Sequence, residues 1–221
     1  SPKVDKIYCA PGNGGIAELA ECVDIAATDI ENMVKFAKDN AIDLVMVAPD
    51  DPLVLGMVDA MEKEGIRAFG PRANAAIIEG SKAFSKELMK KYNITNANYE
   101  VFTDSTSAID YIKAQNTFPT VIKADGLALG KGVIIAQNLE EAEQAVHEMI
   151  DDGKFGKSGS RVVIEEFLTG PEVSVLAFTD GKTVKPMVSA QDHKRAYDND
   201  EGLNTGGMGT FSPSRLYDDA K

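Results

Sequence analysis

Cysteine and long apolar stretches are scarce in this sequence of 221 residues. Its two cysteines, Cys9 and Cys22, have no metal-binding spacing, and we interpret them as reduced thiols packed in the core of a cytoplasmic protein. No apolar run approaches the length of a transmembrane helix and no signal peptide is visible. We therefore expect no membrane partner.

Basic residues are also fewer than acidic residues. The chain has 23 Lys and Arg against 35 Asp and Glu, which gives a formal net charge of −12. Proteins that bind nucleic acid neutralise phosphates with basic residues, so this balance argues against nucleic acid as a partner. The hydrophobic share of 43% is ordinary for a globular protein, and the length allows one large domain or two modest ones. Any phosphate site must be a local positive pocket.

A stretch rich in lysine and glycine, PTVIKADGLALGKGVIIAQ at 119–137, carries the clearest chemical signal. Its two apolar runs predict two strands, with Lys123 near the end of the first and Lys131 in the loop between them. Glycines let a backbone approach a ligand closely, free N–H groups form an anion nest, and lysines add positive charge. The pattern is typical of a nucleotide phosphate site.

Other interpretations fit this stretch less well. A Walker A loop has four residues between its glycines and a Ser or Thr before a helix, whereas Gly126 and Gly130 have three between them, and Gly132 precedes a strand. A protein kinase places its glycine loop before the strand lysine, not after it. A plain β-hairpin with solvated lysines stays open as an alternative.

The first 80 residues alternate between predicted strands and helices. Strands are expected at 6–10, 43–48 and 67–69, the second buried on both faces, and helices at 29–39, 53–64 and 73–79. This alternation predicts a parallel α/β sheet, with binding loops at the carboxyl ends of its strands. The turns at 11–15 and 49–52 occupy such ends, although plain turn chemistry explains them equally well.

The remaining chain predicts an α+β arrangement. A basic helix at 81–92, capped by Ser81 and with a solvated charged face, precedes a unit of strand, helix, two strands and helix over 99–152, which a strand at 161–166 closes. Strands at 172–178 and 183–189 are joined by a tight turn, so we expect them to pair antiparallel. The polar stretches at 191–195 and 204–209 read as loops that carry a site.

Several short motifs then follow one another in a specific order: APGNGG at 10–15, FGP at 69–71, EGSKAF at 79–84, VIKADGLALGKGV at 121–133, VIEEFLTGPEVS at 163–174, AQDHKR at 190–195 and NTGGMG at 204–209. Together they cover nearly the whole chain, which resembles the ATP-grasp enzymes and, among them, the phosphoribosylamine–glycine ligase family. The resemblance implies four parts: an incomplete parallel α/β N-terminal domain at 1–80, a helix and connection at 81–98, an ATP-grasp lid subdomain at 99–168, and the start of a truncated core subdomain at 169–221.

The resemblance also implies site residues. Those expected to bind ATP are Lys82, Lys123, Asp125, Gly126, Gly130, Lys131, Gly132, Glu165, Glu166, Phe167, Leu168 and Glu172. Those expected to bind the other substrates are Gly12, Asn13, Gly14, Asp192, His193, Lys194, Thr205, Gly206, Gly207, Met208 and Gly209. Lys123, Lys131 and Arg195 are implied to act in catalysis by neutralising charge. His193 is read as a binding residue rather than a general base, because it has no visible relay partner.

The reaction implied by the resemblance is a ligation in purine biosynthesis. ATP phosphorylates the glycine carboxylate, and the amine of 5-phosphoribosylamine displaces the phosphate, which gives glycinamide ribonucleotide, ADP and phosphate. The family begins with a strand that precedes Ser1 and carries its Mg²⁺ or Mn²⁺ ligands beyond Lys221, so we expect no metal ligand in these residues and no activity from them alone. The protein is expected to be a monomer. Asp50 and Asp51 depart from the family pattern. The alternatives to this function are another ATP-grasp ligase and a non-catalytic ATP-binding fragment.

Overall fold

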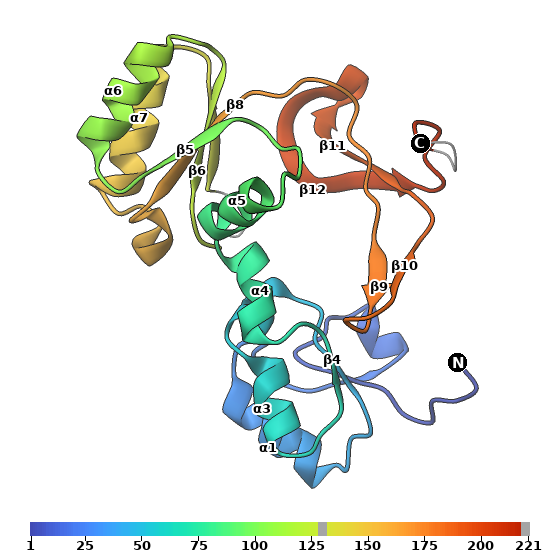
Figure 1. Ribbon diagram of the computed structural model, residues 1–221. Helices are drawn as coiled ribbons and strands as arrows, with labels where there is room; N and C mark the ends of the chain where they lie inside the picture. The colour runs from blue at the N-terminus through green and yellow to red at the C-terminus, as the bar shows by residue number, and fades with distance from the viewer. Residues whose placement is uncertain (128–131, 218–221) are drawn as a thin grey trace. The chain divides into compact units, whose positions relative to one another are not determined.

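The computed structural model describes residues 1–127 and 132–217 (Figure 1). Two compact units make up the chain, one from Ser1 to Phe167 and a second from Leu168 onward. The first unit mixes parallel strand pairs and helices with an antiparallel sheet, and the second consists mainly of antiparallel strands. The expected combination of α/β and α+β structure is confirmed. The finer division into four parts stays a prediction.

Short strands alternate with helices in the first 80 residues, as the sequence predicts. The elements are β1 (Tyr8–Cys9), η1 (Ile16–Glu18), β2 (Glu21–Cys22), α1 (Ile30–Asp39), β3 (Val45–Met46), α2 (Asp50–Val54), α3 (Met57–Lys63), β4 (Ala68–Phe69) and α4 (Ala73–Gly80). Strands β1 and β2 form one parallel pair, and β3 and β4 form another.

Two expectations for this region were wrong in detail. The helix expected over 53–64 is broken into α2 and α3, because Gly56 takes a left-handed conformation with φ of 89° between them. The strand β3 is not buried on both faces. Val45 packs against a buried cluster that includes Ala37 and Met61, whereas Met46 is exposed, and within the described residues β3 pairs only with β4.

Residues 81–167 form the rest of the first unit. Its elements are α5 (Lys82–Lys91), β5 (Tyr99–Phe102), α6 (Ser105–Gln115), β6 (Thr120–Ala124), β7 (Val133–Ala136), α7 (Leu139–Ile150), η2 (Gly156–Gly159) and β8 (Val162–Glu166). The four strands form one sheet in the order β5-β8-β6-β7, and every neighbouring pair is antiparallel. The helix cap predicted from Ser81 is confirmed, because its hydroxyl accepts from the Phe84 N–H, and Asp104 caps α6 by accepting from the Ser107 N–H.

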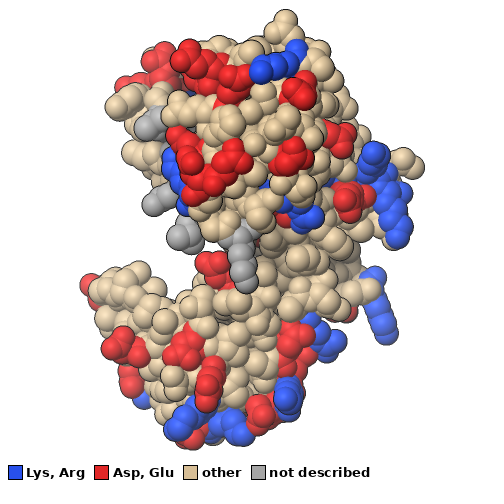
Figure 2. Space-filling model, turned by 90° about the vertical axis from the view of Figure 1, so that its left-hand side faces the viewer, with Lys and Arg blue, Asp and Glu red and all other residues tan. Residues whose placement is uncertain are grey.

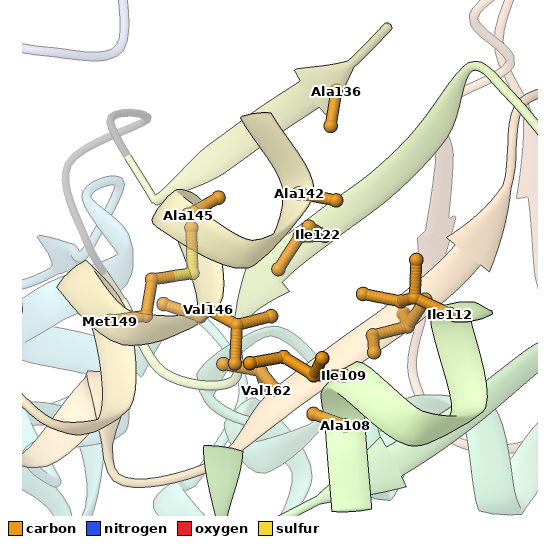
Figure 3. Packing of buried hydrophobic residues seen from close by; sticks show 12 residues of the cluster. Ala108, Ile109, Ile112, Ile122, Ala136, Ala142, Ala145, Val146, Met149 and Val162 are labelled. Atoms are coloured by element: carbon orange, nitrogen blue, oxygen red, sulfur yellow. The ribbon is translucent and has the colours of Figure 1, made fainter. Parts of the chain in front are cut away.

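One face of this sheet is covered by α6 and α7 (Figure 3). Ile122 of β6 lies opposite Ile164 of β8, and both join a buried cluster with Ile112 of α6 and Val146 of α7. Side chains alternate between the faces of a strand. Lys123, next to Ile122, therefore points to the opposite face, together with Glu165.

The second unit contains two antiparallel hairpins. These are β9 (Ala177–Thr179) with β10 (Val184–Pro186), and β11 (Gln191–Tyr197) with β12 (Glu201–Phe211), joined by η3 (Asp198–Asp200). The first hairpin confirms the antiparallel pairing expected for those strands. The second corrects the prediction of loops at 191–195 and 204–209, since both stretches are strands with irregular register. Many glycines suggested loops, but the backbone hydrogen bonds of a hairpin do not require side chains.

Two further features of the described residues bear on the sequence predictions. Cys9 is half-buried and Cys22 is exposed, so a core position for Cys22 was wrong. None of the described helices is both long and apolar enough to cross a membrane.

Candidate functional site

Lys123 and Glu165 lie on the face of the four-stranded sheet that α6 and α7 leave uncovered. Lys123 lies opposite Val163 in the β6–β8 register, and Glu165 lies two residues further along β8 on the same face. The Lys123 Nζ atom donates to Glu165 Oε2 at 2.9 Å. This ion pair joins two residues that the sequence predicts to bind one ligand.

A second lysine, which the sequence reading assigned to a solvated face, reaches the same carboxylate. Lys86 of α5 places its Nζ atom 3.3 Å from Glu165 Oε2, and its side chain is only 10% exposed. It also donates to Asn96 Oδ1 at 3.3 Å and lies 5.5 Å from the centre of the Tyr99 ring. The signal that could have found it is spacing, because Lys86 follows Lys82 by one helical turn.

Glu165 has one oxygen with no internal partner. Glu165 is 6% exposed, and the ammonium groups of Lys86 and Lys123 both approach its Oε2 atom. Among the described side chains, Glu165 Oε1 is a buried polar atom without a hydrogen-bond partner. Since buried acceptors are normally satisfied, this oxygen is a candidate contact for a ligand that carries an N–H donor.

Lys82 lies at the start of α5, beside the same cluster. Its Nζ atom donates to the Gly126 carbonyl at 3.0 Å, and its N–H donates to the Asp125 carbonyl at 3.0 Å. Burial lowers the pKa of Lys82 below its ordinary value, and the nearby charge of Lys123 adds to the decrease. A half-buried ammonium close to another cation would be stabilised by an anionic ligand.

Asp125 fixes the start of the glycine-rich loop. Its carboxylate accepts from Ser81 Oγ at 3.0 Å, from the Ala83 N–H at 2.7 Å and from Arg161 Nε at 2.8 Å. A second guanidinium nitrogen of Arg161 contacts the same carboxylate. The contact joins the ends of three elements, namely α5, β6 and β8. Asp125 thus acts on the ligand-facing residues through this network.

Arg161 belongs to this network, although none of the sequence motifs pointed to it. It is the only arginine between residues 73 and 194, and it directly precedes a buried strand. An arginine in such a place offers a planar fork that matches a carboxylate. A lone arginine directly before a buried strand was therefore the sequence feature that could have identified this residue.

Gly126 follows Asp125 where the backbone approaches a neighbouring turn. A Cβ atom at this position would lie 2.5 Å from Ser158 Oγ and 3.1 Å from Ser158 Cα. The Ser158 hydroxyl donates to the Leu127 carbonyl at 3.0 Å. The glycine is therefore required here by close packing, and it holds the first residues of the loop against 156–159.

Three of the predicted loop residues need separate mention. Gly130 and Lys131 lie outside the described residues. Gly132 is described, and its carbonyl accepts from the Ala124 N–H at 2.8 Å, which extends the β6–β7 pairing by one step.

The residues after Glu165 leave the sheet. Glu166 accepts from the Asn98 N–H and from Asn98 Nδ2, both at 2.9 Å, and these bonds lower the pKa of Glu166. Phe167 is 36% exposed and Leu168 is 63% exposed. Apolar side chains that stay exposed beside a strand end can contact the ring of a ligand.

In the second unit, the predicted substrate residues lie on β11 and β12. Lys194 Nζ contacts Glu172 Oε1 at 2.6 Å and Asp192 Oδ2 at 3.8 Å, and the bond to Glu172 raises the pKa of Lys194. The Thr205 hydroxyl donates to the Lys194 carbonyl at 2.8 Å and accepts from the Gly207 N–H at 3.0 Å. Glu172 and Lys194 therefore form one cluster with the start of the NTGGMG stretch.

A cavity of about 400 Å³ lies on the same hairpin. His193, Arg195 and Met208 line it together with Tyr197 and the turn at 198–200. One guanidinium nitrogen of Arg195 donates to the Gly202 carbonyl at 2.6 Å, and the His193 ring packs against Phe211. Gly206 and Gly209 have open space where a Cβ would stand.

The N-terminal turn is held by its own contacts. Gly12 has φ of 79°, and a Cβ there would lie 2.5 Å from Cys22 Sγ. The Asn13 side chain accepts from the Ile16 N–H at 2.9 Å, so that oxygen is used internally. Gly14 has open space around it, and its surroundings leave room for a ligand to approach the backbone.

Charged side chains are also distributed over the molecular surface (Figure 2). On the face shown in Figure 2, acidic side chains gather over the upper part, and basic side chains are scattered among them. Within the described residues, no group of three or more His, Cys, Asp or Glu side chains could hold a metal ion.

Comparison with known proteins places this geometry in a family context. The profile of the phosphoribosylglycinamide synthetase N domain matches residues 1–79, and the profile of the ATP-grasp (A) domain of the same synthetase matches residues 80–221. A phosphoribosylamine–glycine ligase from Halalkalibacterium halodurans is 52% identical over 221 residues, which is 100% of this chain and 51% of the relative. The chain spans about half the length of the curated relatives it matches.

Solved structures agree with this picture. The crystal structure of a phosphoribosylamine–glycine ligase from Thermotoga maritima superposes with a TM-score of 0.78 at 33% identity, over 95% of this chain and 50% of that one. The biotin carboxylase domain of a 2-oxoglutarate carboxylase from Hydrogenobacter thermophilus, solved with MgADP, superposes with a TM-score of 0.67 at 18% identity, over 86% of this chain and 45% of that one. The second likeness shows the fold alone.

Proposed function

Because the chain belongs to the phosphoribosylglycinamide synthetase family, whose N and ATP-grasp domains together match residues 1–221, we propose that it belongs to an ATP-dependent ligase that joins glycine to 5-phosphoribosylamine. The products are glycinamide ribonucleotide, ADP and phosphate, a step of purine biosynthesis. Relatives that are named for this activity cover the whole chain.

The proposal that this protein binds a nucleotide rests on the cluster formed by Lys82, Lys123 and Glu165. Burial disfavours the positive charge of Lys82, the Lys123 ammonium lies close enough to oppose that charge further, and a polyphosphate compensates both charges. Beside them, the unpaired Glu165 Oε1 offers an acceptor for the amino group of a purine. These groups fit a nucleoside triphosphate better than either a simple anion or an apolar ligand.

The remaining ATP contacts are assigned from the family resemblance. Phe167 and Leu168 supply exposed apolar surface and backbone groups for the adenine ring, and Glu172 supplies a carboxylate for the ribose hydroxyls. Asp125 and Gly126 hold the glycine-rich loop that would cover the phosphates. Gly132 ends that loop.

The chemistry needs no covalent enzyme nucleophile. The glycine carboxylate attacks the γ-phosphorus of ATP, and ADP leaves. The amine of 5-phosphoribosylamine then attacks the acyl carbon, loses a proton and displaces inorganic phosphate. Lys123, together with Lys131 and Arg195, would neutralise the charge on the transferred phosphoryl group, and positioning supplies the rest.

The two acceptor substrates are assigned to other residues. Asp192, His193, Lys194 and the stretch from Thr205 to Gly209 would hold glycine and the adjacent phosphoryl group. The turn of Gly12, Asn13 and Gly14 would bind the phosphate of 5-phosphoribosylamine through its N–H groups.

Mg²⁺ or Mn²⁺ would neutralise the ATP phosphates, but the described side chains offer no cluster to hold either ion. We assign no ligand for it within this sequence. A cytoplasmic location and a monomeric state complete the proposal.

The deciding experiment measures ADP release by the full-length gene product. We expect release that requires both glycine and 5-phosphoribosylamine. ADP release that requires a different acid or amine would show that the protein is another ATP-grasp ligase.

The isolated 221 residues give a second test. We expect them to bind ATP in calorimetry without turnover. Turnover by these residues alone would contradict the assignment of the metal ligands outside this sequence, and ATP binding by a full-length product that never turns over would favour a non-catalytic nucleotide-binding protein.

A further inference from the structure

We propose that Lys86 is a positioning residue, the fixed counter-ion of Glu165, which leaves Lys123 available to bind nucleotide phosphate. The inference rests on the nucleotide site proposed above. It concerns a residue that none of the sequence motifs assigned to a ligand.

Lys86 is buried although its helix is basic and largely exposed. A buried lysine is rare unless its charge is paired. Its Nζ atom lies 3.3 Å from Glu165 Oε2 and 3.3 Å from Asn96 Oδ1. Its ammonium also lies over the Tyr99 ring, at 5.5 Å from the centroid. These three contacts from different elements fix its position.

Lys123 is held less completely. Its side chain is 27% exposed, against 10% for Lys86, and its ammonium contacts the Glu165 carboxylate. Both ammonium groups approach Oε2, so the two lysines share one negative charge. Of the two, Lys123 is the one that can turn toward a ligand on the exposed side.

The shared charge has a direct consequence for binding. Suppose that Lys123 were the only cation in contact with Glu165. Movement of Lys123 to a phosphate would then leave the buried Glu165 carboxylate without a counter-charge, which is strongly unfavourable. With Lys86 in place, Glu165 keeps a partner while Lys123 moves. Glu165 also keeps its orientation, so that Oε1 stays directed to the same place.

A double-mutant cycle tests this role with ADP affinity of the full-length gene product, measured by calorimetry. Lys86→Met should weaken ADP binding about tenfold, the loss of roughly one charged hydrogen bond, because Glu165 then retains Lys123. Lys86→Met combined with Glu165→Gln should regain most of that affinity, since a neutral glutamine no longer retains Lys123. Lys86→Arg should bind like wild type.

Lys90→Met is the matched control. Lys90 lies one turn further along α5 and is exposed, so this change removes the same charge from the same helix without touching Glu165. If Lys86→Met does not fold, Lys86→Gln replaces it in the same cycle. Circular dichroism and the thermal midpoint establish folding of each variant.

The outcomes separate the two proposals. Equal affinities of the Lys86→Met and Lys90→Met variants, or a double variant that binds no better than Lys86→Met alone, would overturn the role of Lys86. Wild-type protein that binds ADP but shows no glycine-dependent ADP release would overturn the proposed ligase, while the cycle would still decide on Lys86. Wild-type protein that binds no nucleotide would overturn both.

Discussion

Lys123 and Glu165 form a diagonal ion pair across strands β6 and β8, on the face of the sheet that α6 and α7 do not cover. Their neighbours Ile122 and Ile164 point the other way into the core. The same alternation that builds the core thus presents both charged groups on the ligand side. A shift of either strand by one residue would turn its side chains to the other face and separate the pair.

Replacement of Lys123 tests the phosphate assignment. Lys123→Ala should weaken ATP binding by about 1.5–3 kcal/mol, the cost of one charged hydrogen bond. Calorimetry on the full-length gene product measures the change. Lys113→Ala is the control, because Lys113 forms an exposed ion pair with Glu143 on α6 and α7. Unchanged ATP affinity in a folded Lys123→Ala variant would count against the assignment.

Replacement of the buried Asp125 is expected to reduce the stability of the fold more than replacement of an exposed aspartate. Asp125→Asn removes the charge that faces Arg161 and one acceptor of the network with Ser81 and Ala83. We expect a loss of about 1–3 kcal/mol in the free energy of unfolding, measured by urea titration. Asp104→Asn is the control, since Asn caps a helix as well as Asp does. Equal stabilities of the two variants would contradict the network.

Close packing at Gly126 gives a prediction with a rescue. Gly126→Ala should cost about 1–3 kcal/mol of stability, because its Cβ would overlap Ser158. Ser158→Gly in the same chain removes the nearest atoms and should restore part of the loss, as thermal denaturation can measure. Gly14→Ala, where space is open, should be nearly neutral. Absence of any rescue would mean that the strain lies elsewhere.

Lys82 predicts a dependence of stability on pH. Its pKa is lowered in the folded chain from the model-compound value of 10.5, mainly by burial. Between the lowered pKa and 10.5, the unfolded chain binds more protons, so the free energy of unfolding rises with pH in that window. Lys82→Met should lose this rise.

The measurement compares wild type with Lys82→Met by urea unfolding at several pH values from neutral upward. We expect the stability of wild type to gain on that of the variant as the pH approaches 10.5. Lys90→Met, on the exposed side of the same helix, should follow wild type. A constant difference between wild type and Lys82→Met would show that the fold does not perturb Lys82.

Regular elements with strong local signals were predictable from the sequence. The helices predicted at 29–39 and 81–92 agree with α1 and α5 to within one residue at each end, because apolar periodicity and caps marked them. The helix expected at 53–64 failed at Gly56, since one left-handed glycine outweighs a continuous apolar pattern. Such a break depends on tertiary packing that periodicity does not record.

The site was predictable only in part. Lys82, Lys123 and Glu165 stood in motifs, and the structure brings them together on one face. Lys86 and Arg161 stood outside the expected positions, because their roles come from partners 79 and 36 residues away in sequence, Glu165 and Asp125 respectively. Helical spacing places Lys86 beside Lys82, but no local pattern shows that a carboxylate from β8 will meet it.

The sheet order β5-β8-β6-β7 has a consequence for synthesis of the protein. Strands β5 and β6 do not pair with each other, and each pairs with β8, which follows both along the chain. Chains emerge from the ribosome with the N-terminal part first. A nascent chain that stops short of residue 162 can form the β6–β7 hairpin but not the sheet, so Lys86 and Lys123 acquire their common counter-charge only when the middle strand arrives last.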